Sequence, residues 1–288
     1  MRIMPTRPGN QPGCKLKEGP RATKPSIAGL YNRVAGQYDR VGPQTFAVFG
    51  RLLVEEACLQ AGMRVLDVAT GRGAILIPAG GALNGQGQVA GIDLAWQMVH
   101  HTRLELAQTH PQLPSALLCM DGEQLGFASA AFDVLLCGFA YFFLDPRQAL
   151  PEWQRVLRPG GLVAISVAER VDPRWAWYEE QLLAFHEQHD LPLYSGSRSG
   201  RGRIHPTDIA ADLRMQKFSR VRVKIHDVDI TYPDAETWWQ AKWTHGARYP
   251  LEHMPPDLLA AFQREVISRA SQMELSERWR LACILARR

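Results

Sequence analysis

The sequence predicts an α/β fold with a parallel sheet, and three observations lead to this prediction. Apolar runs of strand length alternate with stretches in which apolar residues recur every three or four positions, as in βαβ units. The runs are nearly continuously apolar, which is typical of strands buried between two helical layers. The first run leads directly into a glycine-rich turn. The chain has 288 residues, of which 46% are hydrophobic, so it can bury a large core without disulfides or metal sites.

The expected elements follow one another with short connections. Residues 26–61 show helical spacing, and Gly62 is expected to end this helix as a left-handed cap. A further helix is expected to begin near Ala74, directly after the glycine-rich turn. The other expected helices cover residues 95–109, 146–157, 174–188, 234–245 and 257–271. Strands are expected at residues 65–69, 88–94, 116–120, 132–137, 162–168, 221–229 and 280–286.

The net charge of +4 is unevenly distributed along the chain. Residues 1–25 carry a balance of +5, and the remaining residues carry a balance of −1. The body is therefore nearly neutral, which argues against a nucleic-acid partner. The same first residues are rich in proline and glycine and have no hydrophobic period, so we expect a disordered leader. A lid or a partner-binding arm is the alternative for this segment.

The cysteines and the apolar segments indicate the compartment. The five cysteines are widely spaced without a C-x-x-C pair, and Cys119 and Cys137 lie in apolar runs, which fits a reducing compartment. The N-terminus lacks the apolar region of a secretion signal, and no stretch approaches the roughly 20 apolar residues of a membrane span. We therefore expect a cytoplasmic protein without a membrane span. The sequence leaves open whether it is a monomer or a homodimer.

The most specific motif is the segment VLDVATGRG at residues 65–73. A strand runs into a Gly-x-Gly turn and a helix follows, so a ligand can closely approach the backbone and the free N–H groups of the helix start. Twenty residues after Gly73, at the end of the second strand, lies Asp93. A carboxylate at this position can accept hydrogen bonds from both hydroxyls of a ribose. Together these features predict a nucleoside site at the carboxyl edge of the sheet.

Three kinds of nucleotide site share such a turn. A P-loop requires Gly-Lys-Ser or Gly-Lys-Thr, which is absent here. A dinucleotide site requires a third glycine where Leu76 stands. Asp67, inside the first strand, would repel a pyrophosphate but suits a cationic amino-acid group, acting directly or through water. The ligand indicated is therefore a positively charged nucleoside, S-adenosylmethionine.

Further motifs follow the glycine-rich turn in a fixed order. They are Gly91-Ile92-Asp93-Leu94 with Met98, then Asp121-Gly122-Glu123 with Leu125 and Phe127, then Phe132-Asp133, and finally the turn Leu157-Arg158-Pro159-Gly160-Gly161-Leu162. With these motifs the chain resembles a class I S-adenosylmethionine-dependent methyltransferase of the ubiquinone/menaquinone-biosynthesis-like group, which methylates small molecules. The resemblance is clear over residues 28–168 and is recognisable in layout to the end of the chain.

The resemblance implies a fold and a division of the chain. The implied fold is a Rossmann-like, seven-stranded methyltransferase sheet with helices on both faces and a helical cap insertion. Residues 26–168 would form the cofactor-binding core with its N-terminal helices, and residues 169–215 would form the cap. Residues 216–288 would supply the strands and helices that complete the sheet and the substrate pocket.

The resemblance also implies which residues hold the cofactor, S-adenosylmethionine, and its product, S-adenosylhomocysteine. These residues lie in the motifs, at the end of the fourth strand, and on an N-terminal helix that closes over the site. They are Asp67 and the backbone of Ala69, Gly71 and Gly73 at the methionine end; Asp93 at the ribose; Leu94, Met98, Asp121 and Gly122 at the adenine; Cys137 beside the cofactor; and Tyr31 and Tyr38 on the closing helix.

Two positions depart from the family pattern, and two carboxylates have a structural alternative. Ala69 stands where a first glycine is common, which is a tolerated variant. Trp96 stands where a small residue or proline is usual, and we expect it to shape a different adenine wall. Asp67 could instead be a solvent-facing strand-end residue, and Asp93 could be the N-terminal cap of the following helix.

The chemistry needs few catalytic groups. Methyl transfer from a sulfonium is an in-line displacement, so positioning and desolvation can supply most of the rate. A general base is required only where the nucleophile must lose a proton. Tyr141, after the fourth strand, and His245 are the candidate catalytic residues, with a structural role as the alternative for any histidine. The histidines form no metal-ligand pattern, so no metal is expected.

Aromatic residues after the fourth, fifth and sixth strands indicate a cap over an apolar or aromatic small substrate. Packing of cap helices onto the sheet is the alternative for these side chains. Arg198, Arg201 and Arg203 lie in a loop at residues 195–203, which could contact an anionic substrate or be solvated. The candidate substrate-pocket residues are Phe142, Trp175, Tyr178, Trp239 and Arg248.

The function predicted is methyl transfer from S-adenosylmethionine to a small, apolar or aromatic molecule, in secondary metabolism or quinone-type biosynthesis. Two alternatives stay open. An RNA or protein methyltransferase would have a basic body and usually an Asn-Pro-Pro-Tyr motif after the fourth strand, where this chain has Cys-Gly-Phe-Ala-Tyr. A module that uses the cofactor without methylating anything would have the same fold.

Overall fold

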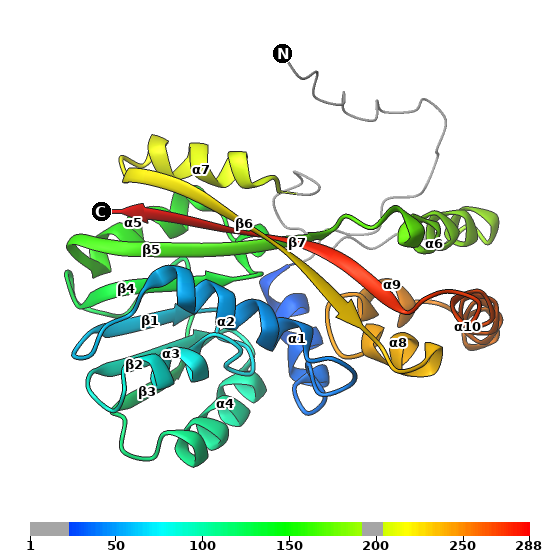
Figure 1. Ribbon diagram of the computed structural model, residues 1–288, viewed down its shortest axis with the longest axis horizontal. Coiled ribbons are helices and arrows are strands. Elements are labelled where there is room, and N and C mark those ends of the chain that lie inside the picture. The colour runs from blue at the N-terminus through cyan, green and yellow to red at the C-terminus, as the bar shows by residue number, and fades with distance from the viewer. Residues whose placement is uncertain (1–22, 192–203) are drawn as a thin grey trace.

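The structure is a computed structural model that describes residues 23–191 and 204–288. Within these segments the chain forms one seven-stranded sheet with the order β3-β2-β1-β4-β5-β7-β6 (Figure 1). Neighbouring strands are parallel from β3 to β5, whereas β7 runs antiparallel between β5 and β6. The strands are β1 (Arg64–Val68), β2 (Gln88–Asp93), β3 (Ser115–Cys119), β4 (Phe132–Gly138), β5 (Leu157–Arg170), β6 (Ser219–Thr231) and β7 (Ser276–Arg287).

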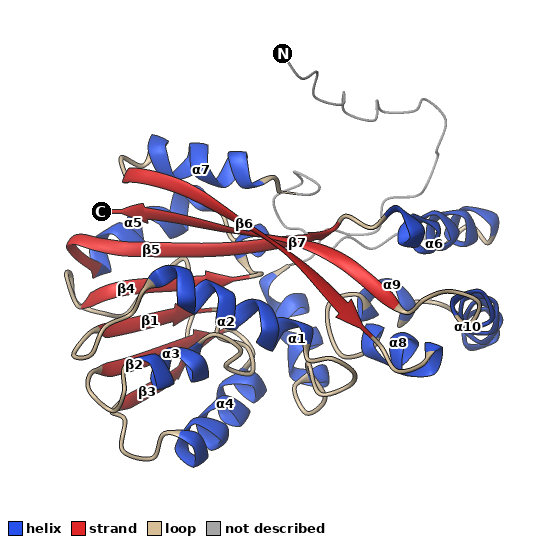
Figure 2. Cartoon of the chain, in the orientation of Figure 1, coloured by secondary structure: helices blue, strands red, loops and turns tan. Residues whose placement is uncertain are grey.

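Helices connect and cover the strands (Figure 2). The α-helices of the described segments are α1 (Lys24–Val34), α2 (Thr45–Ala57), α3 (Leu76–Ala82), α4 (Trp96–Thr109), α5 (Pro146–Val156), α6 (Ala176–Gln188), α7 (Pro206–Met215), α8 (Ala235–Lys242), α9 (Arg248–Leu251) and α10 (Pro256–Ala270). Two short 3-10 helices, η1 (Tyr141–Phe143) and η2 (Pro173–Trp175), follow β4 and β5.

The central strands β1, β2, β4, β5 and β7 are buried on both faces, as expected from their nearly continuous apolar residues, whereas the edge strands β3 and β6 are largely exposed, contrary to the expectation. Along β1, Val65 packs into a cluster with α2, α3 and α4, whereas Leu66 packs into a cluster with α5 and α7. Because successive strand residues point to opposite faces, each apolar strand must fill both clusters. The glycine-rich turn that follows β1 is therefore held on a rigid, buried strand.

A cap of α6, α8, α9 and α10 lies beyond the carboxyl ends of the parallel strands (Figure 1). Its interior contains stacked and edge-to-face aromatic rings that exclude water. β5 and β7 extend from the core into this region, and their pairing ends at Arg170 and Trp279. The fully buried aromatic residues of the cap are Trp175, Trp238, Trp239 and Phe262.

The expected fold class and strand positions are confirmed, and two helix predictions are wrong. The helical pattern at residues 26–61 belongs to two helices, α1 and α2, separated by a turn in which Asp39 and Gln44 have positive φ. α2 ends at Ala57, where Cys58 takes the left-handed conformation with φ 49°. Gly62 is not the cap, because it lies four residues later in the turn before β1. Glycine prefers this conformation and cysteine does not, so the sequence pattern indicated Gly62 as the cap of the helix.

Two further boundaries differ from the expectation. The turn at 159–161 lies within the longer β5, where the pairing with β4 shifts from Phe132–Leu157 to Val134–Leu162. Helix α7 has no counterpart among the expected elements, and it packs with α5 on the sheet rather than with the cap. α1 begins at Lys24, inside the expected leader. The rest of that leader, residues 1–22, and the expected loop at 195–203 lie outside the described residues.

Candidate functional site

A cavity of about 90 Å³ lies at the carboxyl ends of β1, β2 and β4, covered by α1. This is the edge at which open α/β sheets bind ligands, because the strand ends and the following turns leave a crevice there. Most of the residues predicted for the cofactor meet at this cavity. Those that line it are Tyr31, Tyr38, Ala69, Gly71, Asp93, Leu94, Met98, Asp121 and Gly122.

The turn after β1 has the backbone that its glycines predict. Gly71 and Gly73 have φ of 52° and 78°, a region that residues with a side chain rarely adopt. Ala69 has φ 57° without being a glycine, and such a residue costs roughly 1–3 kcal/mol unless its surroundings hold it. The hydroxyl of Thr102 donates to the Gly71 carbonyl over 2.6 Å and fixes the turn from α4.

Asp67 is fully buried beneath this turn. Its Oδ2 accepts a hydrogen bond from the Thr70 hydroxyl over 2.7 Å, whereas its Oδ1 accepts no well-formed hydrogen bond, and the nearby Leu76 N–H only partly compensates for its burial. Burial, with a contribution from nearby Asp93, raises the pKa of Asp67 to about 7. A buried carboxylate oxygen without a well-formed hydrogen bond is costly, and a ligand cation would satisfy it. Asp67 is therefore not the solvent-facing residue of the structural alternative.

Asp93 connects the glycine turn, α4 and the cavity. Its Oδ2 accepts from the Gly71 N–H over 2.9 Å, and its Oδ1 accepts from the Ala95 N–H over 2.8 Å. Asp93 is not the N-cap of α4, because the N-cap is Ala95, whose side chain makes no capping hydrogen bond. The same carboxylate also lines the cavity, and burial raises its pKa. The two backbone contacts and a place in the cavity wall are thus compatible at this position.

The predicted adenine end contains a cation that the sequence analysis missed. Lys24 lines the cavity, and its Nζ contacts Asp121 Oδ2 and lies 2.5 Å from Glu123 Oε2. Lys24 could not be identified from the sequence, because it belongs to the proline- and lysine-rich segment expected to be disordered. Trp96 does not shape the adenine wall as expected, since its side chain points outward and is 55% exposed.

The aromatic wall of the cavity continues toward α2. Tyr38 stacks on Phe46 with a centroid distance of 5.3 Å, and Phe46 meets the edge of Phe139 over the same distance. Phe139 and Phe143 line the cavity, but neither was among the predicted substrate residues. Their signal was the aromatic segment after β4. Tyr141, Phe142 and Phe143 form a short 3-10 helix. The sequence alone does not show which of the three rings points into the cavity.

Three of the predicted cofactor residues do not line the cavity. Asp67 and Gly73 lie beneath the turn, where a Cβ on Gly73 would come within 3.0 Å of Ile77 and Thr102 side-chain atoms. Cys137 is fully buried one residue before the lining residues Gly138 and Phe139, and burial raises the pKa of its thiol.

The candidate catalytic residues lie away from the cavity. Tyr141 is fully buried on the α5 side of the sheet, where its hydroxyl donates to Asp212 Oδ2 over 3.0 Å. His245 packs its ring against Phe46, and its Nδ1 accepts from the Ala247 N–H over 3.2 Å. Burial, with help from Lys242, lowers the pKa of His245 to about 3, so its imidazole is neutral at physiological pH.

The candidate substrate residues form the cap interior rather than the cavity wall. Trp175, Tyr178 and Trp239 are buried among the cap helices, and Arg248 lies over the Trp243 ring and pairs with Glu252. Phe142 packs against Phe143, which separates it from the cavity. The three cap aromatics therefore pack within the cap, as the packing alternative stated.

No helix in the described segments is long and apolar enough to cross a bilayer. In the same segments, no group of three or more His, Cys, Asp or Glu side chains is placed to hold a metal ion.

Comparisons with known sequences place this site in context. A family profile described as a methyltransferase domain matches residues 66–165. Nocamycin O-methyltransferase of Saccharothrix syringae is 29% identical over 253 residues, covering 83% of this chain and 88% of the relative. The aklanonic acid methyltransferase DauC of Streptomyces sp. (strain C5) is 35% identical over 144 residues, covering 50% of this chain and 65% of the relative.

Another relative and a solved structure extend these similarities. A ubiquinone/menaquinone biosynthesis C-methyltransferase of Bordetella parapertussis is 29% identical over 177 residues, covering 58% of this chain and 67% of the relative. The crystal structure of the [4+2]-cyclase SpnF has a TM-score of 0.55 and 19% identity, covering 94% of this chain and 99% of that one. At this identity the structural likeness concerns the fold alone.

Proposed function

We propose that the chain is a class I S-adenosylmethionine-dependent methyltransferase that acts on small molecules, and that its cavity binds S-adenosylmethionine; the methyltransferase-domain match and the methyltransferase relatives support this. The observation that carries the proposal is that Gly71, Asp93 and Asp121 meet at one cavity, with the buried Asp67 beneath the turn, where it would act on the ammonium of the methionine end through water. In this proposal the glycine turn holds the methionine end and Asp93 holds the ribose. Asp121 and Gly122 bind the adenine edge, with Leu94 and Met98 against its faces.

The bound sulfonium would supply an activated methyl group, so the protein has little covalent chemistry to perform. The residues of this chain exclude water and hold the reacting groups in line, which is where most of the rate can arise. Tyr31 and Tyr38 cover the cavity from α1 and the turn after it. Tyr141 and His245 are not assigned as bases, because the Tyr141 hydroxyl is held by Asp212 and the His245 Nδ1 is held by the Ala247 N–H.

We propose that the acceptor is a planar aromatic or quinone-type molecule that packs against Phe139 and Phe143. These rings line the cavity, and Phe46 extends the same wall. Phe139 has φ 56°, a conformation that is strained for a bulky residue and is concentrated at functional sites. The quinone biosynthesis relative supports this class of acceptor, and the O-methyltransferase relative supports a hydroxyl as the methylated group.

Two measurements test the proposal. Isothermal titration with S-adenosylhomocysteine should show binding at one site per chain, and a folded sample that binds nothing would refute the cofactor assignment. Transfer of labelled methyl groups should then be measured on a panel of hydroquinones, phenols and aliphatic alcohols. Turnover confined to the aliphatic alcohols would refute the aromatic acceptor.

The two alternative functions give different outcomes in the same experiments. A protein that uses the cofactor without methylation would bind S-adenosylhomocysteine but would transfer no label to any acceptor, including RNA and protein. A nucleic-acid methyltransferase would label RNA, with an affinity that falls steeply with salt concentration. Neither alternative is favoured by a specific contact of the described residues.

A further inference from the structure

The wall formed by α1 has to move for a ligand to enter. The cavity of about 90 Å³ is smaller than the 300–1,000 Å³ typical of small-molecule pockets. α1 contributes Ile27 and Tyr31 to the wall, and Tyr38 follows in the turn after the helix. α1 lies between the core and the cap, and Arg33 pairs with Glu252 of the cap (Figure 1). The contacts between α1 and the glycine turn therefore determine how the site closes.

Arg72 makes this connection from within the glycine turn. It stands between Gly71 and Gly73, both with positive φ, so the turn conformation sets the direction of its side chain. Its NH1 donates to the Ala35 carbonyl over 2.6 Å, at the carboxyl end of α1. A helix end leaves carbonyl groups without partners, and a cation there is favoured by the helix dipole. The side chain is only 12% exposed, so this contact is sheltered from water.

A second contact of Arg72 reaches the other side of Tyr38. The Arg72 NH2 lies 3.3 Å from Glu105 Oε2 of α4, and the same carboxylate oxygen pairs with Arg40. Ala35 and Arg40 lie on either side of Tyr38 in the chain, so Arg72 is connected to both flanks of this cavity residue. Tyr38 in turn stacks on Phe46. A movement of the glycine turn is thereby linked to the aromatic wall.

We propose that Arg72 is a positioning residue that couples occupancy of the cofactor cavity to closure of α1 and Tyr38. The proposal rests on the proposed function, because the ligand would contact the backbone of Gly71, the residue directly before Arg72. A ligand that fixes the glycine turn also fixes the guanidinium, which then holds the carboxyl end of α1 and, through Glu105, Arg40. Closure completes the wall of Tyr38 and Phe46, so the acceptor binds after the cofactor.

Hydrogen exchange with S-adenosylhomocysteine tests the coupling, because it reports separate segments of the full chain. In the wild type, saturating ligand should slow exchange at least fivefold both in residues 66–94 and in residues 26–41. Arg72→Met should keep the protection of residues 66–94 and lose that of residues 26–41. Arg72→Lys, which keeps the charge but reaches fewer partners, should recover part of it. In Arg72→Met, the Michaelis constant for the acceptor should rise more than the Michaelis constant for the cofactor.

Two further variants keep the test decisive. Arg103→Met is the matched control, because the Arg103 NH2 also donates to a main-chain carbonyl, that of Leu117 over 2.7 Å, without touching α1. It should leave both segments protected. Glu105→Gln weakens the same coupling from the partner side and takes the place of Arg72→Met if that variant does not fold. The proposal would be overturned if the ligand protected residues 26–41 equally in the wild type and in Arg72→Met, or in Glu105→Gln where that variant takes its place. Absence of any protection in the wild type would instead refute the cofactor assignment.

Discussion

Asp67 gives the site a dependence on pH. The ionised carboxylate is the form that attracts an ammonium, and the pKa of about 7 leaves it only partly ionised near neutrality. We therefore predict that the Kd of S-adenosylhomocysteine rises about five- to tenfold between pH 7.5 and pH 6 in the wild type. Isothermal titration at several pH values measures this change. Asp67→Asn should bind more weakly at pH 7.5 and should lose this pH dependence; a steep dependence that persists in the variant would contradict the assignment.

The same pKa makes Asp67 destabilising when no ligand is bound. Its pKa is raised from 3.8 in the unfolded chain, so between about pH 4 and pH 7 the folded protein binds more protons than the unfolded one. The contribution of Asp67 to stability is thus present at low pH and lost as the pH rises toward 7. Asp67→Asn should raise the free energy of unfolding at pH 8 by up to about 4 kcal/mol, with little change at pH 4.5.

Asp93 has two structural contacts in addition to its proposed ligand contact, so its substitution needs a matched control. We predict that Asp93→Ala weakens S-adenosylhomocysteine binding by about 1.5–3 kcal/mol, since ribose hydroxyls in a closed site would be unpaired. Asp234→Ala is the control, because the Asp234 side chain also accepts from a backbone N–H at a helix start, that of Thr237 in α8, and neither residue lines the cavity. Titration calorimetry on both variants separates the roles, and equal affinities would remove Asp93 from the binding site.

At the scale of single residues, sequence reasoning identified the groups whose chemistry is local to a motif. Asp67, Gly71 and Asp93 are close in the chain to the turn that organises them, so spacing alone brings them together. Lys24 and Arg72 depend on contacts between segments distant in sequence, and composition assigned the first to a disordered leader. The cap tryptophans have the same aromatic character whether they face a substrate or one another.

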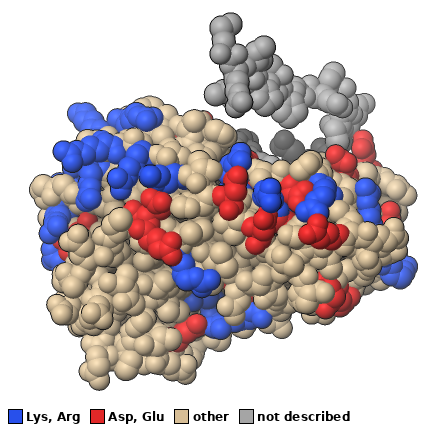
Figure 3. All heavy atoms as spheres, in the orientation of Figure 1, with Lys and Arg blue, Asp and Glu red and all other residues tan. Residues whose placement is uncertain are grey.

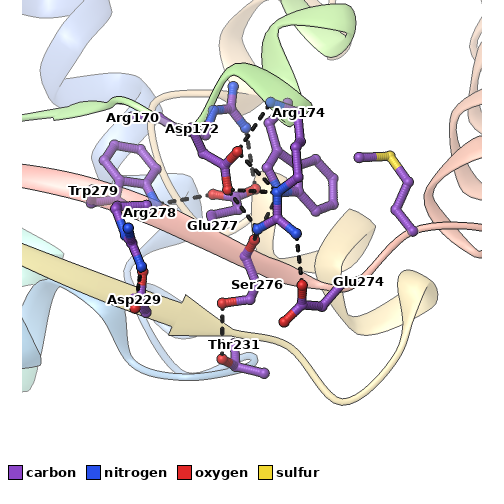
Figure 4. A network of polar contacts seen from close by, with 12 residues as sticks. Arg170, Asp172, Arg174, Asp229, Thr231, Glu274, Ser276, Glu277, Arg278 and Trp279 are labelled. Atoms are coloured by element: carbon purple, nitrogen blue, oxygen red, sulfur yellow. Dashed lines mark hydrogen bonds and ion pairs between the residues drawn. The ribbon is translucent and has the colours of Figure 1, made fainter.

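Strand β7 holds the cap to the sheet through one buried carboxylate. Glu277 is fully buried, and it accepts hydrogen bonds from the indole N–H groups of Trp238 and Trp279 over 2.6 and 3.0 Å. Arg170 contacts the same carboxylate over 3.2 Å (Figure 4). Lys242 contacts it over 3.3 Å. Burial opposes ionisation of Glu277, but the two cations outweigh it and hold its pKa below the ordinary value. Its ionisation is needed because both cations are themselves buried.

We predict that Glu277→Gln lowers the free energy of unfolding by about 3–5 kcal/mol, because it leaves Lys242 buried without an anion and leaves Arg170 with Glu179 alone. Glu274→Gln is the control, since its partner Arg174 is half-exposed and the Glu274 side chain is 74% exposed. It should change stability by less than about 0.5 kcal/mol. Denaturant unfolding measures both, and equal effects would contradict a special role of the buried carboxylate. The wild-type contribution should decrease as the pH falls through the pKa of Glu277.

At the scale of elements, the sequence predicts strands better than helix ends or the cap. The central strands β1, β2, β4, β5 and β7 were found because they are buried on both faces and are therefore nearly continuously apolar, which the exposed edge strands β3 and β6 are not. Helix α2 ends at Ala57, and Cys58 rather than Gly62 is its cap. Contacts of the turn set this end, and no residue preference predicts it. Helix α7 was missed because its apolar side is formed by only a few residues, Ile209, Ala210 and Leu213, and depends on the sheet.

At the scale of the whole molecule, the visible charges are mostly arranged as neighbours of opposite sign. Figure 3 shows Lys and Arg side chains beside Asp and Glu side chains across one face, with basic groups gathered at one end. On β6 and β7, Arg278 pairs with Asp229 and Arg280 pairs with Asp227. This agrees with the near-neutral body expected from the sequence. The sequence could predict the balance of charge but not its pairing, because that depends on strand register.

Continuous strands connect the two ends of the molecule, and this determines how it unfolds. β5 and β7 pair without interruption from Leu162–Arg287 in the core to Arg170–Trp279 beside the cap. The cap therefore cannot unfold without breaking strands that also belong to the core, and we predict a single cooperative transition. In a Trp153→Phe variant, which lacks the tryptophan buried in the core, tryptophan fluorescence follows mainly the cap, where Trp175 and Trp238 are buried, and far-ultraviolet circular dichroism follows the whole sheet and its helices. The two thermal midpoints should coincide.

Ligand binding at the core should then protect the cap as well. S-adenosylhomocysteine at 100 times its Kd adds about 2.7 kcal/mol to the stability of a cooperative unit that binds it only when folded. For a chain of this size that corresponds to roughly 5–10 °C in the midpoint. The same shift should be seen by fluorescence and by circular dichroism. If the ligand raised only the circular dichroism midpoint, the cap would be a separate unit, and closure over an acceptor would have to be explained by movement of the cap rather than of α1.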